Sequence, residues 1–406
     1  MRRLPLYALS LTIVFSQVTA FAQTVPALNA LVRVYAAQSK TSSVEIFAPG
    51  DTTPKDTHDY FSGQTIVYSA DGKWLGGYGL QEGSTTPQVT YGQQGQTPLQ
   101  IDLPAQATPI RIVFSPDSRY FAYTLLVFTT QQWTMGIVDL ASGKRVQFAG
   151  KSSPGPVVGD ATPDLNVVQG MALPLSWSPD GKRMFVESFI FSMAAPRRFD
   201  GLYSLEVSAL DFAKSDPTPL PQTTRLLQDE QMFGEPLISP DGTKALYLSN
   251  DAKNAPENYA PTKFSQTANT LTVADLETGK TSVVAQADKG QGIAASQWTP
   301  DSKSILYATG GFQKTSYIVD QHGFLLDLAS GKAQEIGIFE SDPSAYLVNV
   351  LVCADHVFFV SKLYRDDFSG DATLYSASLS DLKSRSAALI VAQNITLIRC
   401  VSSITT

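Results

Sequence analysis

Aspartates recur between short apolar runs of this sequence and are its first candidates for chemistry. A lone carboxylate can act as a base, and several that converge can hold a metal ion. The copies lie about 46 to 63 residues apart, so each belongs to its own structural unit rather than to one cluster. In a Pro-Asp-Gly stretch, Asp accepts hydrogen bonds from nearby backbone amides and stabilises a turn. We therefore predict turns, and no metal site, at Asp71, Asp117, Asp180, Asp241, Asp301 and, in a weaker copy, Asp355.

Other catalytic patterns are sparse. The three histidines, His58, His322 and His356, show neither the His-Glu-x-x-His motif nor a short metal-binding spacing. The run GKSS at 150–153 lacks the earlier glycine of a phosphate-binding loop, because Arg145 occupies that position. We therefore predict a protein without catalytic residues, metal ligands or cofactors.

The turn aspartates belong to a repeat that organises the chain. Each copy has β-branched and aromatic residues on both sides of the turn, as two half-buried strands require. A second tight turn follows, with the pattern Asp-Leu-x-x-Gly-Lys, so the unit is predicted to contain four antiparallel strands. Ser118 and Ser302 replace the turn glycine, and those two turns are expected to be strained or of another type. The copies are VYSADGKWLGGY (67–78), VFSPDSRYFAYT (113–124), WSPDGKRMFVES (177–188), ISPDGTKALYLS (238–249), WTPDSKSILYAT (298–309) and the weaker VLVCADHVFFVS (350–361).

This pair of turns resembles the repeat of TolB-like β-propellers, which also builds the propeller domains of prolyl-oligopeptidase-type peptidases. The resemblance covers nearly all of residues 28–406 and implies an all-β propeller of four-stranded antiparallel blades. The sequence departs from both groups, because it has no separate α/β domain before the propeller and no Gly-x-Ser-x-Gly elbow of a hydrolase. What the resemblance implies about function is binding of a protein or peptide.

The two ends of the chain are predicted to share one blade. ITLIRCVSS (395–403) aligns with the first strands of the repeats, while LVRVYAAQ (31–38) and SSVEIFA (42–48) have the character of outer strands without a preceding hairpin. A blade assembled from both ends gives seven blades and leaves no open edge where the ring closes. Six complete blades is the alternative.

The sequence has only two cysteines, Cys353 and Cys400. They occupy equivalent positions in the first strands of the last two predicted blades. A lone pair in an exported protein is typical of one disulfide, which here would clamp the closure of the ring. Two buried free thiols are the alternative.

The first residues have the features of a cleavable export signal. Arg2 and Arg3 precede the apolar run LYALSLTIVF (6–15), and Ala20-Phe21-Ala22 fits a cleavage site. We expect residues 1–22 to be removed after Ala22, leaving a single periplasmic or secreted domain over 23–406. No other apolar stretch approaches the length of a membrane span. The net charge of −7 and the absence of a basic run argue against nucleic acid as a partner.

Long, irregular connections between the predicted strands fall on the ring face opposite the tight turns. Loops on a rigid scaffold commonly carry binding sites, and Arg and aromatic side chains commonly anchor partners. The candidate binding residues are Arg197, Arg198, Phe199, Tyr259, Phe264, Phe312, Tyr317, His322, Tyr364, Arg365 and Asp366.

The function predicted from these features is an exported, monomeric, non-enzymatic propeller that binds a protein or peptide. Two alternatives remain. One is a lyase or hydrolase acting on a saccharide or peptide at the channel mouth, which His322 and two nearby carboxylates would mark. The other is a structural surface protein without a diffusible ligand.

Overall fold

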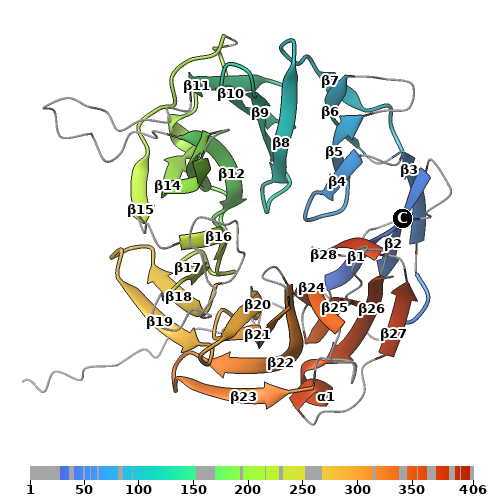
Figure 1. Ribbon diagram of the computed structural model, residues 1–406. Coiled ribbons are helices and arrows are strands. Elements are labelled where there is room, and N and C mark those ends of the chain that lie inside the picture. Colours follow the sequence, from blue (N-terminus) through green and yellow to red (C-terminus); the bar gives the residue numbers. More distant parts are fainter. Residues whose placement is uncertain are drawn as a thin grey trace, which may run out of the picture.

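The computed structural model is built almost wholly of β-strands, which confirms the all-β prediction (Figure 1). No helix in the described part of the chain has the length and hydropathy of a membrane span. The structure describes residues 28–35, 41–48, 51–54, 56–61, 64–80, 86–93, 95–151, 170–192, 195–214, 216–227, 232–251, 268–313, 317–337, 345–353, 355–363, 372–383, 389–393 and 395–402.

Within these residues the strands form seven four-stranded sheets arranged around a central opening (Figure 1). Six of them use consecutive strands, with the first strand nearest the opening. Their strands are β4 (Gln64–Tyr68), β5 (Trp74–Leu80), β6 (Pro87–Gln93) and β7 (Leu99–Ile101); β8 (Ala107–Phe114), β9 (Tyr120–Val127), β10 (Gln132–Asp139) and β11 (Arg145–Lys151); β12 (Met171–Trp177), β13 (Arg183–Ser192), β14 (Ala195–Glu206) and β15 (Thr224–Leu227). The remaining three sheets comprise β16 (Met232–Ile238), β17 (Lys244–Ser249), β18 (Thr270–Asp275) and β19 (Thr281–Gln286); β20 (Gln291–Trp298), β21 (Ser304–Gln313), β22 (Tyr317–Asp327) and β23 (Lys332–Ile336); β24 (Ala345–Cys353), β25 (His356–Leu363), β26 (Ala372–Ser378) and β27 (Leu389–Gln393).

The seventh sheet combines the two ends of the described chain. β28 (Ile395–Ser402) pairs with β1 (Leu28–Tyr35), followed by β2 (Thr41–Phe47) and β3 (Asp56–Phe61). In this register Ala30 lies opposite Cys400. Sequence analysis did not predict β3, because DTHDYF shows no apolar alternation.

The repeated hairpins keep one hydrogen-bond pattern. In each of five hairpins a Ser or Thr hydroxyl donates to the Asp two residues later, at 2.5–2.7 Å. The same Asp accepts the backbone N–H two residues further on, at 3.0–3.1 Å. The hydroxyl oxygen accepts the N–H five residues after it, at 2.8–3.0 Å. These contacts confirm that Asp71, Asp117, Asp180, Asp241 and Asp301 are turn residues.

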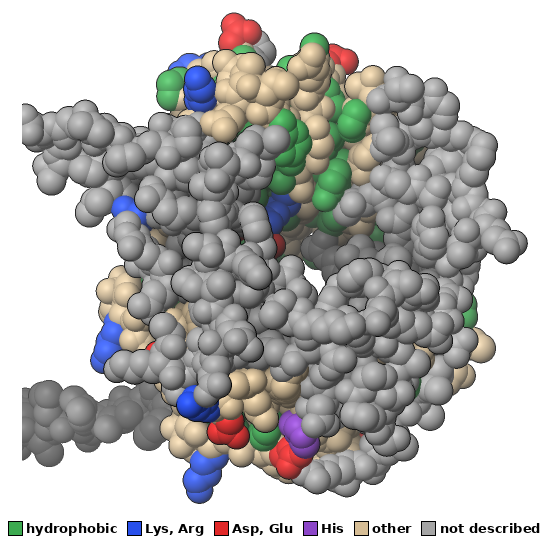
Figure 2. All heavy atoms as spheres, in the orientation of Figure 1, with side chains coloured by type: hydrophobic (Ala, Val, Ile, Leu, Met, Phe, Trp, Pro, Cys, Tyr) green, Lys and Arg blue, Asp and Glu red, His purple; other side chains and the backbone are tan. Residues whose placement is uncertain are grey.

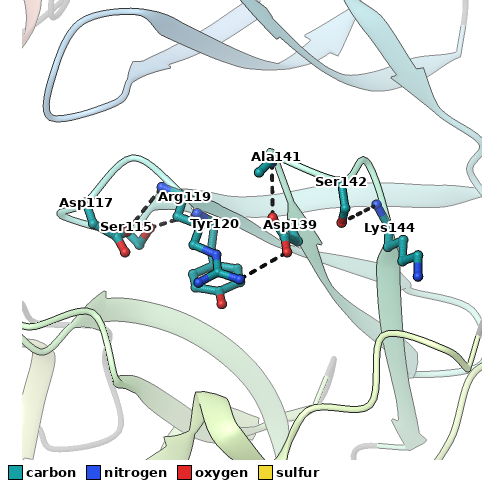
Figure 3. Close-up of polar contacts among 8 residues, drawn as sticks. All are labelled: Ser115, Asp117, Arg119, Tyr120, Asp139, Ala141, Ser142 and Lys144. Carbon is teal, nitrogen blue, oxygen red and sulfur yellow. Dashed lines mark hydrogen bonds and ion pairs between the residues drawn. The ribbon is translucent and has the colours of Figure 1, made fainter.

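The second turn of each unit lies beside the first. Figure 3 shows this in the sheet of β8–β11, where the Arg119 guanidinium contacts Asp139 at 3.4 Å. The Leu140 N–H also donates to the Arg119 carbonyl at 2.8 Å. The turns that lack Gly-Lys depart from the predicted pattern. SLEVSALD (204–211) contains a 3-10 helix, Val207–Ala209, and LYSASLSD (374–381) leads into the helix α1 (Leu379–Lys383).

The apolar core lies between neighbouring sheets. One cluster joins Phe148 of β11 and Tyr120 of β9 to Trp177 of β12 and Met184 of β13. Similar clusters fill the spaces between the following sheets. Burial of one such side chain contributes about 1.5–3 kcal/mol, so the inter-sheet surfaces make the ring a rigid support for its loops.

Candidate functional site

The two faces of the ring differ in how their polar groups are used. Consecutive antiparallel strands place the Ser/Thr-x-Asp turns and the second turns of each sheet on one face, here called the turn face. The other connections lie on the opposite face, here called the loop face. On the turn face the repeated carboxylates already accept hydroxyl and amide hydrogen bonds. Their chemistry is therefore structural.

Such contacts lower the pKa of several turn carboxyls. The Ser178 hydroxyl is the main cause for Asp180, and the amide and hydroxyl of Thr278 are the main causes for Asp275. At Asp241 burial opposes ionisation, but hydrogen bonds from Ser239 and Thr243 outweigh it and the pKa is lowered. Carboxyls with lowered pKa values are poor general bases at neutral pH.

Neighbouring turns on this face are connected to each other. The Asp71 N–H donates to the Ser118 Oγ at 3.2 Å, and the Asp241 N–H donates to the Ser302 Oγ at 3.0 Å. Ser118 and Ser302 adopt φ values of 57° and 60°, close to those of the glycines that they replace. The alternative of another turn type is therefore wrong. The serines keep the left-handed turn conformation and add a hydrogen bond between sheets.

Five predicted anchors lie on two long hairpins of the loop face. β13 and β14 have 10 and 12 residues, and β21 and β22 have 10 and 11, whereas the other described strands have nine or fewer. The far end of the first hairpin carries Arg197, Arg198 and Phe199, with Arg198 opposite Ile190. The far end of the second carries Phe312 and Tyr317. The side chains of these five residues lie outside the description.

The other predicted anchors are not brought to the same place. Tyr259, Phe264, Tyr364, Arg365 and Asp366 fall outside the described residues. His322 lies in β22, and its Nδ1 is 3.1 Å from Glu335 Oε1 in β23, the outermost strand of that sheet. Both side chains are about half exposed. The histidine atoms visible in Figure 2 lie at the periphery, away from the central opening.

The connection between β17 and β18 on the loop face is held at its two ends by hydrogen bonds of a buried side chain. The Asn269 side chain accepts the Asp251 N–H at 2.7 Å and donates to the Asp251 carbonyl at 2.8 Å. Asn269 is 1% exposed, and the Ser249 and Thr272 hydroxyls meet at 2.9 Å beside it. These bonds hold the two ends of the connection between β17 and β18, which includes the predicted anchors Tyr259 and Phe264.

An ion cluster that sequence analysis missed joins three sheets near the channel. The Arg111 guanidinium in β8 donates to Glu187 of β13 at 3.3 Å and to Glu235 of β16 at 2.8 Å. The Glu187 side chain is 1% exposed, whereas the Glu235 side chain is 45% exposed. Basic and acidic atoms are visible beside the central opening in Figure 2. A buried carboxylate needs such a partner, because an unpaired charge is costly to bury.

Arg111 and Glu235 share one position in the repeat. Each stands four residues before the turn serine of its unit, on the innermost strand of its sheet. Irregular pairing occurs beside this position in five innermost strands, at Pro109/Arg111, Pro174/Ser176, Phe233/Leu237, Ile293/Ala295 and Leu347/Asn349. Such bulges re-aim side chains. An alignment of the repeats at the turn serine places Arg111 and Glu235 at the same position. It does not show which sheets their contact joins.

Two further predictions concern metal ligands and the two cysteines. The described residues contain no group of three or more His, Cys, Asp or Glu side chains able to hold a metal ion. Cys353 ends β24, is fully buried and is not a free thiol. β24 and β28, which carries Cys400, are innermost strands of adjacent sheets.

Comparisons with known proteins show the fold. No family model matches the sequence, and no curated protein matches it. An oligogalacturonate lyase in complex with manganese is similar in structure, with a TM-score of 0.52 and 12% identity over 90% of this chain and 84% of that chain. The β-propeller domain of the Trilobed protease from Pyrococcus furiosus has a TM-score of 0.50 and 13% identity over 88% and 95%. TolB from Acinetobacter baumannii has a TM-score of 0.43 and 16% identity over 86% and 68%. The chain therefore has a β-propeller fold.

Proposed function

We propose that this protein is an exported, non-enzymatic β-propeller that binds a protein or peptide through its loop face. The observation that carries the proposal is the difference between the two faces. The turn face uses its carboxylates and hydroxyls in its own hairpins. The loop face extends the hairpins β13–β14 and β21–β22, whose far ends carry arginines and aromatic residues.

These residue types suit a protein partner. Arg, Tyr and Phe offer large contact area together with hydrogen bonds, and they dominate the binding energy of many interfaces. The rigid ring limits the conformational entropy that the scaffold loses on binding. An exposed peptide segment lying across Arg197, Arg198, Phe199, Phe312 and Tyr317 is the class of partner that we propose.

The same proposal includes export and a covalent closure. Residues 1–22 would be removed and residues 23–406 would fold as one domain outside the cytoplasm, where disulfides persist. Cys353 is not free, and the sequence offers Cys400 as its only possible intramolecular partner. A Cys353–Cys400 bond would join the innermost strands of the last sheet and the closing sheet.

A second candidate function rests on the ion cluster of the channel. Carboxylates can transfer protons, and an arginine can hold a saccharide or a peptide. A lyase or hydrolase site at this ion cluster is therefore the alternative. It predicts that Glu235→Gln abolishes turnover of an acidic oligosaccharide or a peptide. The binding proposal predicts no such turnover by the unmodified protein.

Partner capture from the native compartment tests the binding proposal. The bait proteins are the unmodified chain, the loop-face variant Arg197→Ala/Arg198→Ala, and the turn-face control Arg119→Ala. The Arg119 side chain is 56% exposed, so we expect this control to fold. We expect one partner with the unmodified chain and the control, and its loss with the loop-face variant. Equal recovery by all three baits, or no recovery above background, would contradict the proposal.

A further inference from the structure

The outer strand β11 takes part in the one isolated β-bridge among the described residues. Thr218, in the connection between β14 and β15, forms a parallel bridge with Phe148 of β11. The Thr218 N–H donates to the Gln147 carbonyl at 3.0 Å, and the Ala149 N–H donates to the Thr218 carbonyl at 2.9 Å. A segment of one sheet thus pairs with the outer edge of the preceding sheet.

The sequence of this segment alternates with proline. It reads Asp216-Pro217-Thr218-Pro219-Leu220-Pro221. In an extended segment, alternate residues direct their backbone groups to opposite sides. Thr218 directs its N–H and carbonyl to β11, so Pro217, Pro219 and Pro221 occupy positions directed away from β11. Proline has no N–H, and the outward side of the segment therefore offers no donor to a further strand.

Apolar contacts hold the segment on both sides of Thr218. The Phe212 ring stacks on Tyr120, with ring centroids 5.9 Å apart, and Tyr120 stacks on Trp177 at 5.6 Å. Leu220 packs against the same apolar cluster between the two sheets. The segment is therefore anchored to the ring and does not depend on the Thr218 hydrogen bonds alone.

The other outer strands show why β11 needs such a neighbour. Irregular pairing distorts β15, β19 and β27 beside their inner neighbours. β23 is regular but carries Lys332 and Glu335 and lies beside α1, β3 is regular but carries Asp56 and Asp59, and β7 has only three residues. Irregularity, charge and short length all discourage edge-to-edge pairing. β11 pairs regularly along its whole length, and its centre, Val146–Gly150, is uncharged.

We infer that the segment 216–221 is an edge cap, which occupies a strand-pairing surface on β11 and prevents a second copy of this chain from pairing there. Pairing through Thr218 fills the edge, and the alternate prolines stop the sheet from growing outward. The partner excluded by the cap is another copy of the same chain, because an uncharged, regular edge pairs readily with its own equivalent. The inference does not rest on the proposed binding function.

The first test replaces the three prolines. In Pro217→Val/Pro219→Val/Pro221→Val the outward positions regain donors and gain β propensity, while Thr218 is kept. We expect the mass in solution, measured by light scattering, to rise to at least twice that of the unmodified chain. The control Pro104→Val, at an exposed turn outside this edge, should leave the mass unchanged. A folded triple variant with unchanged mass would overturn the inference.

The second test uses the unmodified chain and stays informative if the triple variant fails to fold. The Ala149 amide should exchange with deuterium about tenfold or more slowly than an unpaired edge amide, because it donates to Thr218. Thr218→Pro removes the hydrogen bond from the Thr218 N–H to the Gln147 carbonyl, and it should accelerate exchange of the Ala149 amide. Rapid exchange at Ala149 in the unmodified chain would show that the cap is not in place.

Discussion

The backbone N–H of Asp241 donates to the Ser302 Oγ at 3.0 Å and joins hairpins from neighbouring sheets. Ser302 has the positive φ that glycine provides in the equivalent turns at Gly72, Gly181 and Gly242. Placing serine at this φ value costs free energy, and the hydrogen bond from the Asp241 N–H, which glycine cannot accept, offsets that cost. Asp71 and Ser118 repeat the arrangement at 3.2 Å.

Substitutions at Ser302 should separate these two effects. Ser302→Ala loses the hydrogen bond and keeps the positive φ, so we expect the free energy of unfolding to fall by about 1–2 kcal/mol. Ser302→Gly loses the same bond but removes the backbone strain, and the change should stay within about 0.5 kcal/mol. Urea denaturation measures both values. Equal losses for Ala and Gly would contradict this account of the turn.

Arg111 should be among the most sensitive charged residues for stability. Arg111→Met removes the cation 3.3 Å from the buried Glu187, and we expect a loss of about 3 kcal/mol in the free energy of unfolding. Glu235→Gln should cost only about 0.5–1 kcal/mol, because its side chain is partly exposed and screened. Lys182→Met, at the exposed pair with Asp180, is the control. A loss for Arg111→Met no larger than that of the control would contradict a supporting role for the ion cluster.

The turn aspartates should make the protein sensitive to acid. The pKa values of Asp71, Asp241, Asp180, Asp275 and Asp327 are all lowered from 3.8 in the folded chain. Between the folded pKa and 3.8 the unfolded chain binds more protons, so the stabilisation is present above 3.8 and is lost as pH falls through the folded values. Urea midpoints should therefore decrease below about pH 4. Asp241→Asn should reduce this pH dependence, and an unchanged slope would contradict it.

A disulfide bond should link the two cysteines. Mapping of the unreduced protein should recover Cys353 linked to Cys400, and Cys353→Ser/Cys400→Ser should lower the free energy of unfolding by about 2–4 kcal/mol. The covalent bond should matter most at the closing sheet, so amide exchange should increase in β1 and β28. Recovery of both cysteines as free thiols would show that strand pairing alone closes the ring.

Local sequence predicted the turns well and the contacts between sheets poorly. Ser178 and Asp180 are close in sequence, and their hydrogen bond depends on turn chemistry alone. Arg111 and Glu235 meet only because irregular pairing turns both towards the channel across an intervening sheet. The edge cap also depends on neighbouring sheets, so the prolines around Thr218 indicated only a loop. The predicted anchors Arg197, Arg198, Phe199, Phe312 and Tyr317 were expected in irregular loops, but they lie in strands that lengthen two hairpins, because the repeat does not show how far strand pairing continues.

Site-directed photo-crosslinking tests the proposed loop-face binding most directly. A crosslinking side chain would replace Phe199 or Phe312 on the loop face, and Lys182 or Lys303 on the turn face, in the protein expressed in its native compartment. The proposal predicts that both loop-face positions form an adduct with the same partner and that neither turn-face position does. Adducts formed only from Lys182 and Lys303, or none from Phe199 and Phe312, would contradict it.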